Sequence, residues 1–555
     1  MVRATFSGFN TALSALQANQ KRLDITGQNL SNMNTAGYTR QQLEASSLNY
    51  TNPVSHYSNG NETAVGFGVS MDRVSQIRDP YLDIQYRSQS ADCSYTNRLQ
   101  TALNSLSKVL DETTISGIRQ AFDDIQSTLT SMQDPAKVSD PIYESELRTK
   151  MQSVCNLFNQ ASRQISQAEQ NEFQRLTGEG SSEQGDVQKI NDILRQIGDL
   201  NVQIKRNQVA GHPSLELQDE RNLLLDELSG YIPVETRYYK DDAHSGNNAY
   251  DYDANGAVIG KKDWPDDLEV SMNYIDAQGK SQKLILVNGS DLGADGLTKN
   301  YGQLSVLNRD HQPAASVSDP ANISIKFEKA PSYQVNGQAA TDVYAELKGI
   351  HFEGGSLQAS LDMLQKKGTG NVINGSVDDV RGYQYYSEKL DQLADTFAKS
   401  MNASNNGNNH KDQNLLSNST DDSTNGITAG NIGISKGWTS GTIHISTDGT
   451  NRTDTILDMI AAMKDTKKLN GKTFADYMNN LSTQLASDSS SNQTALKTGT
   501  TVLNSIQDSR DSLSGVSLDE EATNMMAYVS AYNAASRLMT ALDEVLNTLI
   551  SNTGA

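Results

Sequence analysis

Apolar residues near the C-terminus recur at the spacing of a coiled coil. Between Leu513 and Ile550, one row repeats every seven positions and a second row follows three positions behind it, which places both on one side of a helix. The two rows are Leu518, Met525, Tyr532, Met539 and Leu546, and Tyr528, Ala535, Leu542 and Leu549. The pattern predicts a long helix that begins after Ser517, and we expect Ser517 to form a capping box with Glu520.

The N-terminus has a matching apolar face. Its apolar residues alternate by three and four positions, which is again the spacing of one side of a helix. They are Phe6, Phe9, Leu13, Leu16, Leu23 and Leu30. Because an isolated helix of this length is marginal in water, we expect the two terminal helices to pair as a coiled-coil-like bundle that brings both ends of the chain together.

The faces away from this seam carry very few charges. Between Ala522 and Ile550 the charged residues are Arg537, Asp543 and Glu544, and the N-terminal segment is equally poor in charge. A helix that faces bulk water normally carries more. Two interpretations remain open: an intramolecular helix pair with a plain surface, or a pair whose uncharged sides pack against copies of the same protein in a polymer.

Between the terminal segments the pattern predicts helices interrupted by a β-rich region. A helical periodicity begins at Asp79-Pro80, where an N-cap precedes a proline, and continues to about Gly230. From residue 231 to 352, β-branched runs alternate with Asn-Gly pairs, which favour hairpin turns. Residues 403–452 are rich in Asn, Ser, Thr and Gly and contain a predicted strand at Thr442–Ile445.

We therefore expect a multidomain, mainly α-helical fold with an inserted β-rich domain and a second, loop-rich or small β insertion. The two terminal segments are interpreted as polymerisation helices, and the helical body as lying between them. The expected segments are 1–40 (N-terminal helix), 41–230 (body), 231–353 (β-rich), 354–402 (body), 403–452 (second insertion), 453–514 (body) and 515–555 (C-terminal helix).

Composition narrows the classes of function. The chain has 555 residues and a formal net charge of -21, and it has no basic cluster, which argues against a nucleic-acid partner. No apolar run is long enough to span a bilayer, and Thr5 and Ser7 interrupt any secretory signal. The two cysteines, Cys93 and Cys155, fall in helical patterns and are interpreted as buried, unreactive thiols rather than a disulfide or a metal site.

Motifs that could carry chemistry are weak. Asp251 to Gly256 matches the first half of a calcium loop, but Lys262 stands where the loop needs a glutamate, so a hairpin turn is preferred. Gly433-Ile-Ser435-Lys-Gly437 has the letters of a hydrolase elbow without the expected strand before it. The histidines are dispersed. We expect no catalytic residue, cofactor or metal.

Several motifs resemble the axial proteins of the bacterial flagellum. The N-terminal stretch from Asn29 to Tyr38 is similar to a motif of rod, hook and hook-associated proteins, and the stretch from Arg510 to Glu521 is similar to the C-terminal motif of the hook-associated protein 1 family. That family is also resembled by the segments Gly66-Phe-Gly68-Val69, Arg78-Asp79-Pro80-Tyr81-Leu82, Leu217 to Leu228, Gly354-Gly355-Ser-Leu357, Met526-Ala-Tyr528 and Ala531-Tyr532-Asn-Ala534.

The resemblance implies a structural function and a location. Members of that family form the junction between hook and filament, are needed for filament assembly and lack enzymatic activity. They are extracellular parts of the flagellum, exported through the flagellar type III apparatus without a cleaved signal. The implied partners are copies of the same chain in a ring or tube, neighbouring hook and second junction proteins, the filament cap during assembly, and a cytoplasmic export chaperone at the C-terminal helix.

Two alternatives stay open. The chain could be another axial subunit, of hook or filament, which would be shown by polymerisation of the purified protein alone. It could also be a surface adhesin or glycan-active enzyme on an axial scaffold, with its activity in the β-rich region.

Overall fold

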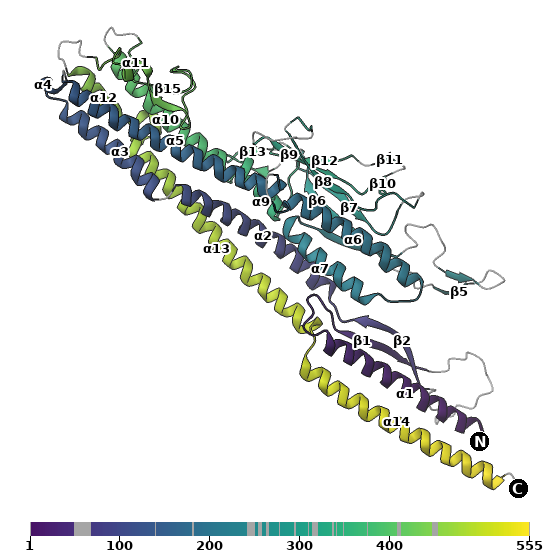
Figure 1. Ribbon diagram of the computed structural model, residues 1–555. Coiled ribbons are helices and arrows are strands. Elements are labelled where there is room, and N and C mark those ends of the chain that lie inside the picture. The colour runs from purple at the N-terminus through teal and green to yellow at the C-terminus, as the bar shows by residue number, and fades with distance from the viewer. Residues whose placement is uncertain are drawn as a thin grey trace.

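The structure is a computed structural model of an elongated molecule whose two termini lie at the same end (Figure 1). At residues 2–7 only the backbone is described. The described residues are 2–48, 68–110, 112–138, 140–179, 182–240, 250–252, 258–261, 266–276, 278–292, 296–308, 310–312, 320–335, 338–339, 341–347, 349–373, 376–407, 412–446 and 453–553.

The terminal unit consists of two long helices and a hairpin. Its elements are α1 (Val2–Ser31), β1 (Gln41–Ser47), β2 (Val69–Gln76) and α14 (Leu518–Thr553). The strands β1 and β2 pair in an antiparallel hairpin, and α1 lies beside α14 (Figure 1). The predicted pairing of the N- and C-terminal helices is thus confirmed.

The body is built from long helices that run along the same axis (Figure 1). Two of them, α2 and α5, start at an Asp-Pro pair, where the aspartate side chain accepts a backbone N–H and the proline occupies the first helical turn. The helices of the body are α2 (Pro80–Val109), α3 (Glu112–Ser131), α4 (Pro135–Val138), α5 (Pro141–Thr177), α6 (Asp186–Val209), α7 (Leu215–Tyr231), α9 (Ser356–Gln365), α10 (Tyr383–Asn406), α12 (Asp454–Lys464) and α13 (Phe474–Ser514).

Aromatic side chains join the body helices. Phe122 of α3 lies with its ring centroid 6.0 Å from Phe158 of α5, 5.2 Å from Phe397 of α10 and 5.5 Å from Phe474 of α13. All four side chains are buried. Four helices that are far apart in the sequence therefore share one aromatic core.

The β-rich insertion contains two antiparallel three-stranded sheets, of order β3-β6-β7 and β12-β9-β8. Short hairpins accompany them, including β4 paired with β5; the turn proposed at Asp253–Gly256 lies outside the described residues. Its strands are β3 (Glu235–Lys240), β4 (Tyr250–Tyr252), β5 (Val258–Lys261), β6 (Asp266–Ile275), β7 (Ser281–Asn288), β8 (Gln303–Asn308), β9 (Ile323–Glu328), β10 (Gln334–Val335), β11 (Gln338–Ala339) and β12 (Val343–Ala345). A separate hairpin of β13 (Val372–Ile373) and β14 (Ser376–Val377) follows α9 in the body.

The chain leaves the helical body and re-enters it at almost the same point. Gly355 has a φ of +83°, and a Cβ added there would lie only 2.4 Å from the carbonyl oxygen of Tyr231. The N–H of Gly355 donates to the carbonyl of Ala91 in α2, at 2.9 Å. A glycine is required here because both the backbone conformation and the close approach exclude a side chain.

The second insertion differs from the sequence prediction. It contains β15 (Leu416–Asn418) paired with β16 (Ile432–Ile434), followed by the short helix α11 (Lys436–Ser440). The predicted strand at Thr442–Ile445 is wrong, because the backbone there forms hydrogen bonds with the side chain of Asn405 instead of with a neighbouring strand. The Nδ2 of Asn405 donates to the carbonyl of His444, and its Oδ1 accepts from the N–H of Ser446.

The expectation that no strand precedes Ser435 is also wrong, since β16 leads directly into α11. Ser435 itself is buried and caps α11, with its Oγ accepting from the N–H of Trp438 at 3.2 Å. His444 instead contacts Glu144, with its Nδ1 3.2 Å from a carboxylate oxygen. Ser435 is therefore engaged in helix capping.

Candidate functional site: the terminal helix pair and its joint with the body

The terminal helices run antiparallel. Three contacts show how the two helices are aligned. At one end Gly8 faces Leu542, and a Cβ added at Gly8 would lie 3.4 Å from the leucine side chain. At the other end the Nδ2 of Asn29 lies 3.4 Å from the Oε2 of Glu521. Between them, the guanidinium of Arg22 lies over the ring of Tyr528, 5.6 Å from its centroid. The start of α1 thus lies near the end of α14 (Figure 1).

The residues proposed for the helix-pairing seam fall into two groups. Phe9, Leu16, Leu23, Leu30, Met525, Tyr528, Met539, Leu542 and Leu546 are half-buried, whereas Leu13, Leu518, Tyr532 and Leu549 are exposed. The side chain of Phe6 lies outside the described residues. Which of these side chains carry the pairing stays a prediction.

The most deeply buried side chains of the pair are small or polar, with Ile25 as the exception. On α1 they are Ala12, Ala18, Asn19, Ile25, Thr26 and Asn29, and on α14 they are Glu521 and Ala535. A search for large apolar residues misses such positions. The available signal was the series of small residues at helical spacing, which lets two helices approach closely.

The β1–β2 hairpin covers another side of α1. Gly68 has a φ of +112°, and a Cβ placed there would lie 2.2 Å from the hydroxyl oxygen of Ser14. That hydroxyl accepts a hydrogen bond from the N–H of Val69 at 3.2 Å. Gly68 is therefore the residue that allows the hairpin to lie directly against α1.

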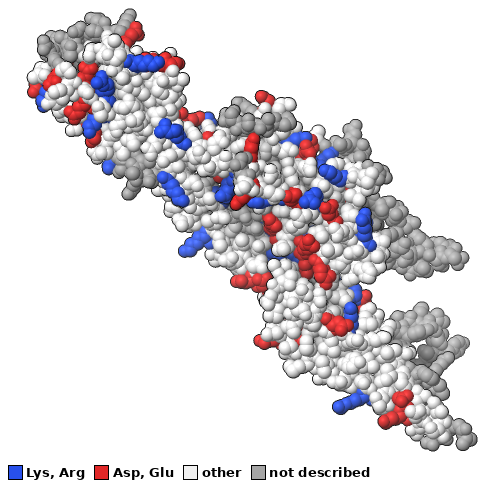
Figure 2. All heavy atoms as spheres, viewed as in Figure 1, with Lys and Arg blue, Asp and Glu red and all other residues white. Residues whose placement is uncertain are grey.

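The outer surface of α14 is apolar and almost free of charge. Met526 is 66% exposed, Ile550 63% and Val545 55%, and Val529 and Leu538 are exposed as well. Figure 2 shows that charged side chains gather over the body and are sparse over the terminal pair. Exposed apolar side chains in this density mark a surface that becomes buried against another molecule.

A short connector joins α13 to α14. At Gly515 an added Cβ would lie 2.4 Å from the carbonyl oxygen of Asp511, and the N–H of Gly515 donates to that oxygen at 2.9 Å. The carbonyl of Ser517 accepts from the N–H of Glu521 at 3.0 Å, which starts α14. The capping box proposed for Ser517 and Glu520 stays a prediction; the Glu520 carboxylate lies 2.7 Å from Arg40.

Arg40 and Asn29 hold the connector, α1 and α14 together. Arg40 pairs with Glu521 at 2.8 Å, and its backbone N–H donates to the carbonyl of Ser514 at 2.9 Å. The Oδ1 of Asn29 accepts from the N–H of Gln41 and from the hydroxyl of Tyr38. The buried amide of Asn29 and the side chain of Arg40 thus fix the position of the segment that connects α1 to β1.

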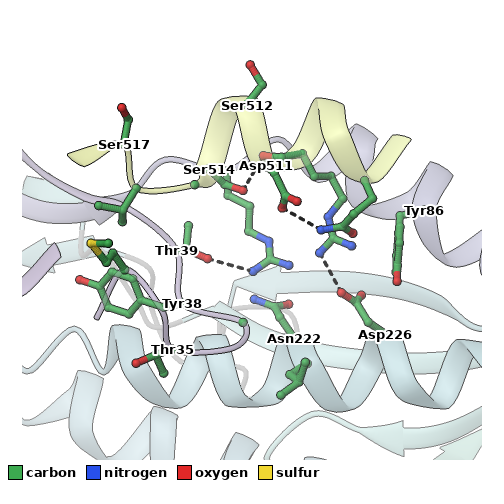
Figure 3. A pocket seen from close by; sticks show the side chains of 18 of the residues that line it. Thr35, Tyr38, Thr39, Tyr86, Asn222, Asp226, Asp511, Ser512, Ser514 and Ser517 are labelled. Carbon is green, nitrogen blue, oxygen red and sulfur yellow. Dashed lines mark hydrogen bonds and ion pairs between the residues drawn. The ribbon is translucent and has the colours of Figure 1, made fainter. Parts of the chain in front are cut away.

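Arginines also connect the connector region to the body. Arg510 of α13 pairs with Asp83 at 3.1 Å and with Asp226 at 2.7 Å, and its guanidinium lies 4.3 Å from the centroid of the Tyr86 ring. Asp226 also pairs with Arg87 at 2.8 Å. The guanidinium of Arg510 donates to a carboxylate oxygen of Asp226 on α7, which is labelled in Figure 3. We call Arg40, Arg78, Arg87, Arg510 and their carboxylates the arginine joint.

Asp219 of α7 receives the chain as it enters β1. Its carboxylate accepts the N–H of Thr39 at 3.0 Å, and Arg78 lies 3.8 Å away. Burial raises the pKa of Asp219 to about 6, while the hydrogen bond from Thr39 and the charge of Arg78 oppose that shift. The carboxylate is therefore held at a contact between the terminal unit and the body.

A cavity of about 800 Å³ opens at this joint (Figure 3). It is lined by the loop after α1, by α7, and by the end of α13 with its connector, including Thr35, Tyr38, Asn222 and Ser514. Among the charged side chains at its wall, Arg510 pairs with Asp226, and Glu520 pairs with Arg40. These residues are suited to hold segments in place rather than to transform a substrate.

Other chemistry finds no support in the described part of the chain. No group of three His, Cys, Asp or Glu side chains comes together there as a metal ion would require, and no described helix has the length and apolar content to cross a membrane. Cys93 and Cys155 are buried and free, as predicted, and burial raises the pKa of Cys155 to about 12.

Comparison with known proteins identifies flagellar relatives. Residues 103–262 match the family model described as flagellar hook-associated protein FlgK helical domain, residues 9–39 match flagella basal body rod protein, and residues 509–552 match flagellar basal body rod FlgEFG protein C-terminal. Both rod-protein matches fall on the terminal helices.

The chain is 29% identical over 568 residues to flagellar hook-associated protein 1 of Bacillus subtilis, covering 99% of each chain. It is 29% identical over 230 residues to the protein of that name in Salmonella typhimurium, covering 41% of this chain and 38% of the relative. Among solved structures, the flagellar hook junction protein FlgK from Burkholderia pseudomallei is 19% identical, with a TM-score of 0.38 over 61% of this chain and 45% of that one.

Proposed function

We propose that the chain forms the junction between hook and filament as a structural axial protein, because it is similar from end to end to flagellar hook-associated protein 1 of Bacillus subtilis. The observation that supports this function best is the terminal helix pair, whose outer surface is apolar and nearly uncharged. Such a surface is stable in water only when another molecule covers it.

Exposed apolar residues lie on both flanks of the terminal pair. Successive residues of a helix are separated by about 100°, so Leu538, Val545 and Leu549 fall on one side of the buried line through Ala535. Leu518, Val529 and Ile550 fall on the other side. A subunit with apolar surface on two flanks can contact two neighbours at once, as assembly into a ring or tube requires.

The arginine joint gives the proposed polymer a fixed geometry. Arg40 joins the segment before β1 to α14, and Arg87 and Arg510 join α2, α7 and α13 to one another. The two groups are linked where Asp219 of α7 accepts the N–H of Thr39. Hydrogen bonds to charged groups are stronger than neutral ones. In this proposal the terminal unit polymerises, and the joint sets how the body and its β-rich insertion project from the tube.

The proposed partners are those that the resemblance to flagellar hook-associated protein 1 implies. Copies of the chain, the neighbouring hook protein and a second junction protein would contact the terminal unit and body, and the filament cap would cover the assembly site. Before export through the flagellar type III apparatus, without a cleaved signal, a cytoplasmic chaperone would bind α14. The apolar helix would thus be covered first by the chaperone and later by its neighbours.

The proposed function is non-enzymatic, in keeping with relatives that are named flagellar hook-associated protein 1. The β-rich insertion is the region where an adhesin or a glycan-active enzyme would have to reside. Binding or hydrolysis of glycans by the intact protein would contradict a purely structural function.

The test is deletion of Gly515 to Ala555 in cells that otherwise assemble flagella. We expect such cells to secrete filament subunits into the medium without forming a filament. The variant itself is measured in cells, medium and sheared appendages, which separates failed export from failed incorporation. The control is Ile142→Lys, at a body position that is 71% exposed, which should leave filaments intact.

Normal filaments on cells carrying the deletion would overturn the proposal. Purified full-length protein that polymerises alone into long filaments would favour a filament or hook subunit instead.

A further inference from the structure

The sequence contains eight Asn-Gly pairs, and four of them lie within the described residues: Asn288-Gly289, Asn406-Gly407, Asn425-Gly426 and Asn470-Gly471. An asparagine followed by glycine can lose its amide spontaneously, because glycine has no side chain to obstruct its own backbone nitrogen. The four pairs therefore present the same chemistry in four different structural settings.

We propose that Asn425 is a site of spontaneous deamidation in the folded protein and that the other three described pairs are protected by their hydrogen bonds. The nitrogen of Gly426 loses its proton to base and attacks the side-chain carbonyl carbon of Asn425. A C–N bond forms, ammonia leaves, and water then opens the cyclic imide to aspartate or isoaspartate. The net reaction consumes one water and releases one ammonia.

Asn425 and Gly426 meet the requirements of this reaction. Both residues are exposed, and a Cβ added at Gly426 would meet nothing within 4 Å, so water and base have access. Among the described residues, none accepts a hydrogen bond from the N–H of Gly426, and none forms a hydrogen bond with the side-chain amide of Asn425. The turn is held by other atoms: the carbonyl of Gly426 accepts from Asn431, and the N–H of Asn425 donates to Ser423.

Asn470 is a matched comparison within the same molecule. It is exposed like Asn425, and its glycine also has a positive φ and open space around it. The difference lies in the nucleophile, because the N–H of Gly471 donates to the carbonyl of Thr466 at 2.9 Å. A nitrogen that is held in a hydrogen bond must break it before it can be deprotonated and turn toward the amide.

The remaining two pairs are held through the asparagine side chain. Asn288 is buried, and its amide donates to Asp291 and Ser332. Asn406 accepts from the N–H of Gln413 and donates to Asn414 at 2.8 Å. In both cases the carbonyl carbon cannot rotate toward the following nitrogen without loss of these bonds.

The experiment incubates the full-length protein in mildly alkaline buffer and follows each Asn-Gly peptide by mass spectrometry, since the product is about 1 Da heavier. We expect Asn425 to convert at least about tenfold faster than Asn470, Asn406 and Asn288 in the folded protein, and the four rates to converge in urea. Conversion adds one negative charge to a net charge of -21, so native isoelectric focusing provides a second readout.

Two variants sharpen the result. Asn425→Gln should remove the modified 425 peptide and reduce the acidic band by the share that this peptide accounts for, because a glutamine forms the imide far more slowly, and Asn470→Gln should leave both unchanged. Equal rates at Asn425 and Asn470 in the folded protein would overturn the proposal, as would an unmodified Asn425. A difference that persists in urea would overturn it as well, since local sequence rather than the fold would then be the cause.

Discussion

The helices α14 and α5 are nearly equal in length, with 36 and 37 residues, but they differ sharply in burial. The helix α5 buries eleven side chains, most of them large and apolar, including Phe158 and Leu147. Among the described side chains of α14, only Glu521 and Ala535 are buried. A body helix is thus covered by its own chain, and the terminal helix is not.

The difference shows where each region obtains its stability. Each Å² of apolar surface removed from water contributes about 25 cal/mol, so the body gains most of this stabilisation within the monomer. The terminal pair leaves much of its apolar surface in water until a neighbour covers it. Substitutions should therefore act on folding in the body, on both folding and geometry at the arginine joint, and on assembly in the terminal pair.

The largest loss of folding stability is expected for Phe122→Ala. The ring contacts three other buried phenylalanines from separate helices, so its removal leaves a cavity and should lower the free energy of unfolding by about 3–5 kcal/mol. Leu538→Ala on α14 is the control and should change it by less than about 0.5 kcal/mol. Chemical denaturation monitored by circular dichroism measures the free energy of unfolding of both variants. Equal losses would contradict the claim that the body, and not the terminal pair, supplies most of the folding stability.

The next effect is expected for Arg510→Ala in the arginine joint. The substitution leaves Asp83 and Asp226 without one of their cations and should cost about 2 kcal/mol, since Arg78 and Arg87 still contact these carboxylates. The control is Arg195→Ala, whose exposed pair with Asp192 should contribute less than about 1 kcal/mol. Thermal unfolding of the two variants tests the difference, and a neutral Arg510→Ala would contradict it.

Ionisation of Asp219 should change the free energy of unfolding by about 2 kcal/mol or less between pH 4 and pH 7. Its pKa of about 6 in the folded protein exceeds the ordinary value of 3.8, so the folded state holds a proton that the unfolded chain releases. The free energy of unfolding should therefore be highest, as far as this group is concerned, near pH 4 and below, and it should fall as the pH rises toward 6. Asp219→Asn keeps an acceptor for the N–H of Thr39 and should be the more stable protein at pH 7, with equal stability at pH 4.

The smallest effect on folding, with the largest on assembly, is expected for Val545→Lys. This side chain is 55% exposed, so the isolated protein should unfold within about 0.5 kcal/mol of the unchanged chain. A lysine buried between subunits would lack a partner, and cells should lose filaments. The matched control is Val209→Lys on α6, 65% exposed, which should leave filaments in place. Filaments on Val545→Lys cells would argue that this flank faces solvent.

Helices were the part of the fold that the sequence predicted best. Periodic apolar positions located the terminal pair and, together with the start at Asp79-Pro80, α2, because a helix is specified by neighbours three and four residues away. The strand predicted at Thr442–Ile445 failed for the opposite reason. Its β-branched residues favour a strand, but the distant Asn405 supplies the hydrogen bonds that a partner strand would have supplied.

The arginine joint could not be predicted residue by residue. Asp226 and Arg510 are 284 positions apart, and the sequence contains many other acidic residues that could have paired with the arginine. The sequence indicated helices in the segments Arg78 to Leu82 and Leu217 to Leu228 and a resemblance of both to a family, but not that they meet. Their structural reason, a meeting of α2, α7 and α13, becomes visible only when the chain is folded.

The contact between Gly355 and Tyr231 has a consequence for how the chain can vary. The two ends of the β-rich region lie next to each other, where Gly355 approaches Tyr231. The end of α7 and the start of α9 can therefore keep this contact whatever the length of the chain between them. Because the entropy of closing a loop rises only slowly with its length, this region can be shortened, exchanged or loaded with foreign sequence at little cost to the body. The β-rich region can thus be replaced while the helical body keeps its fold.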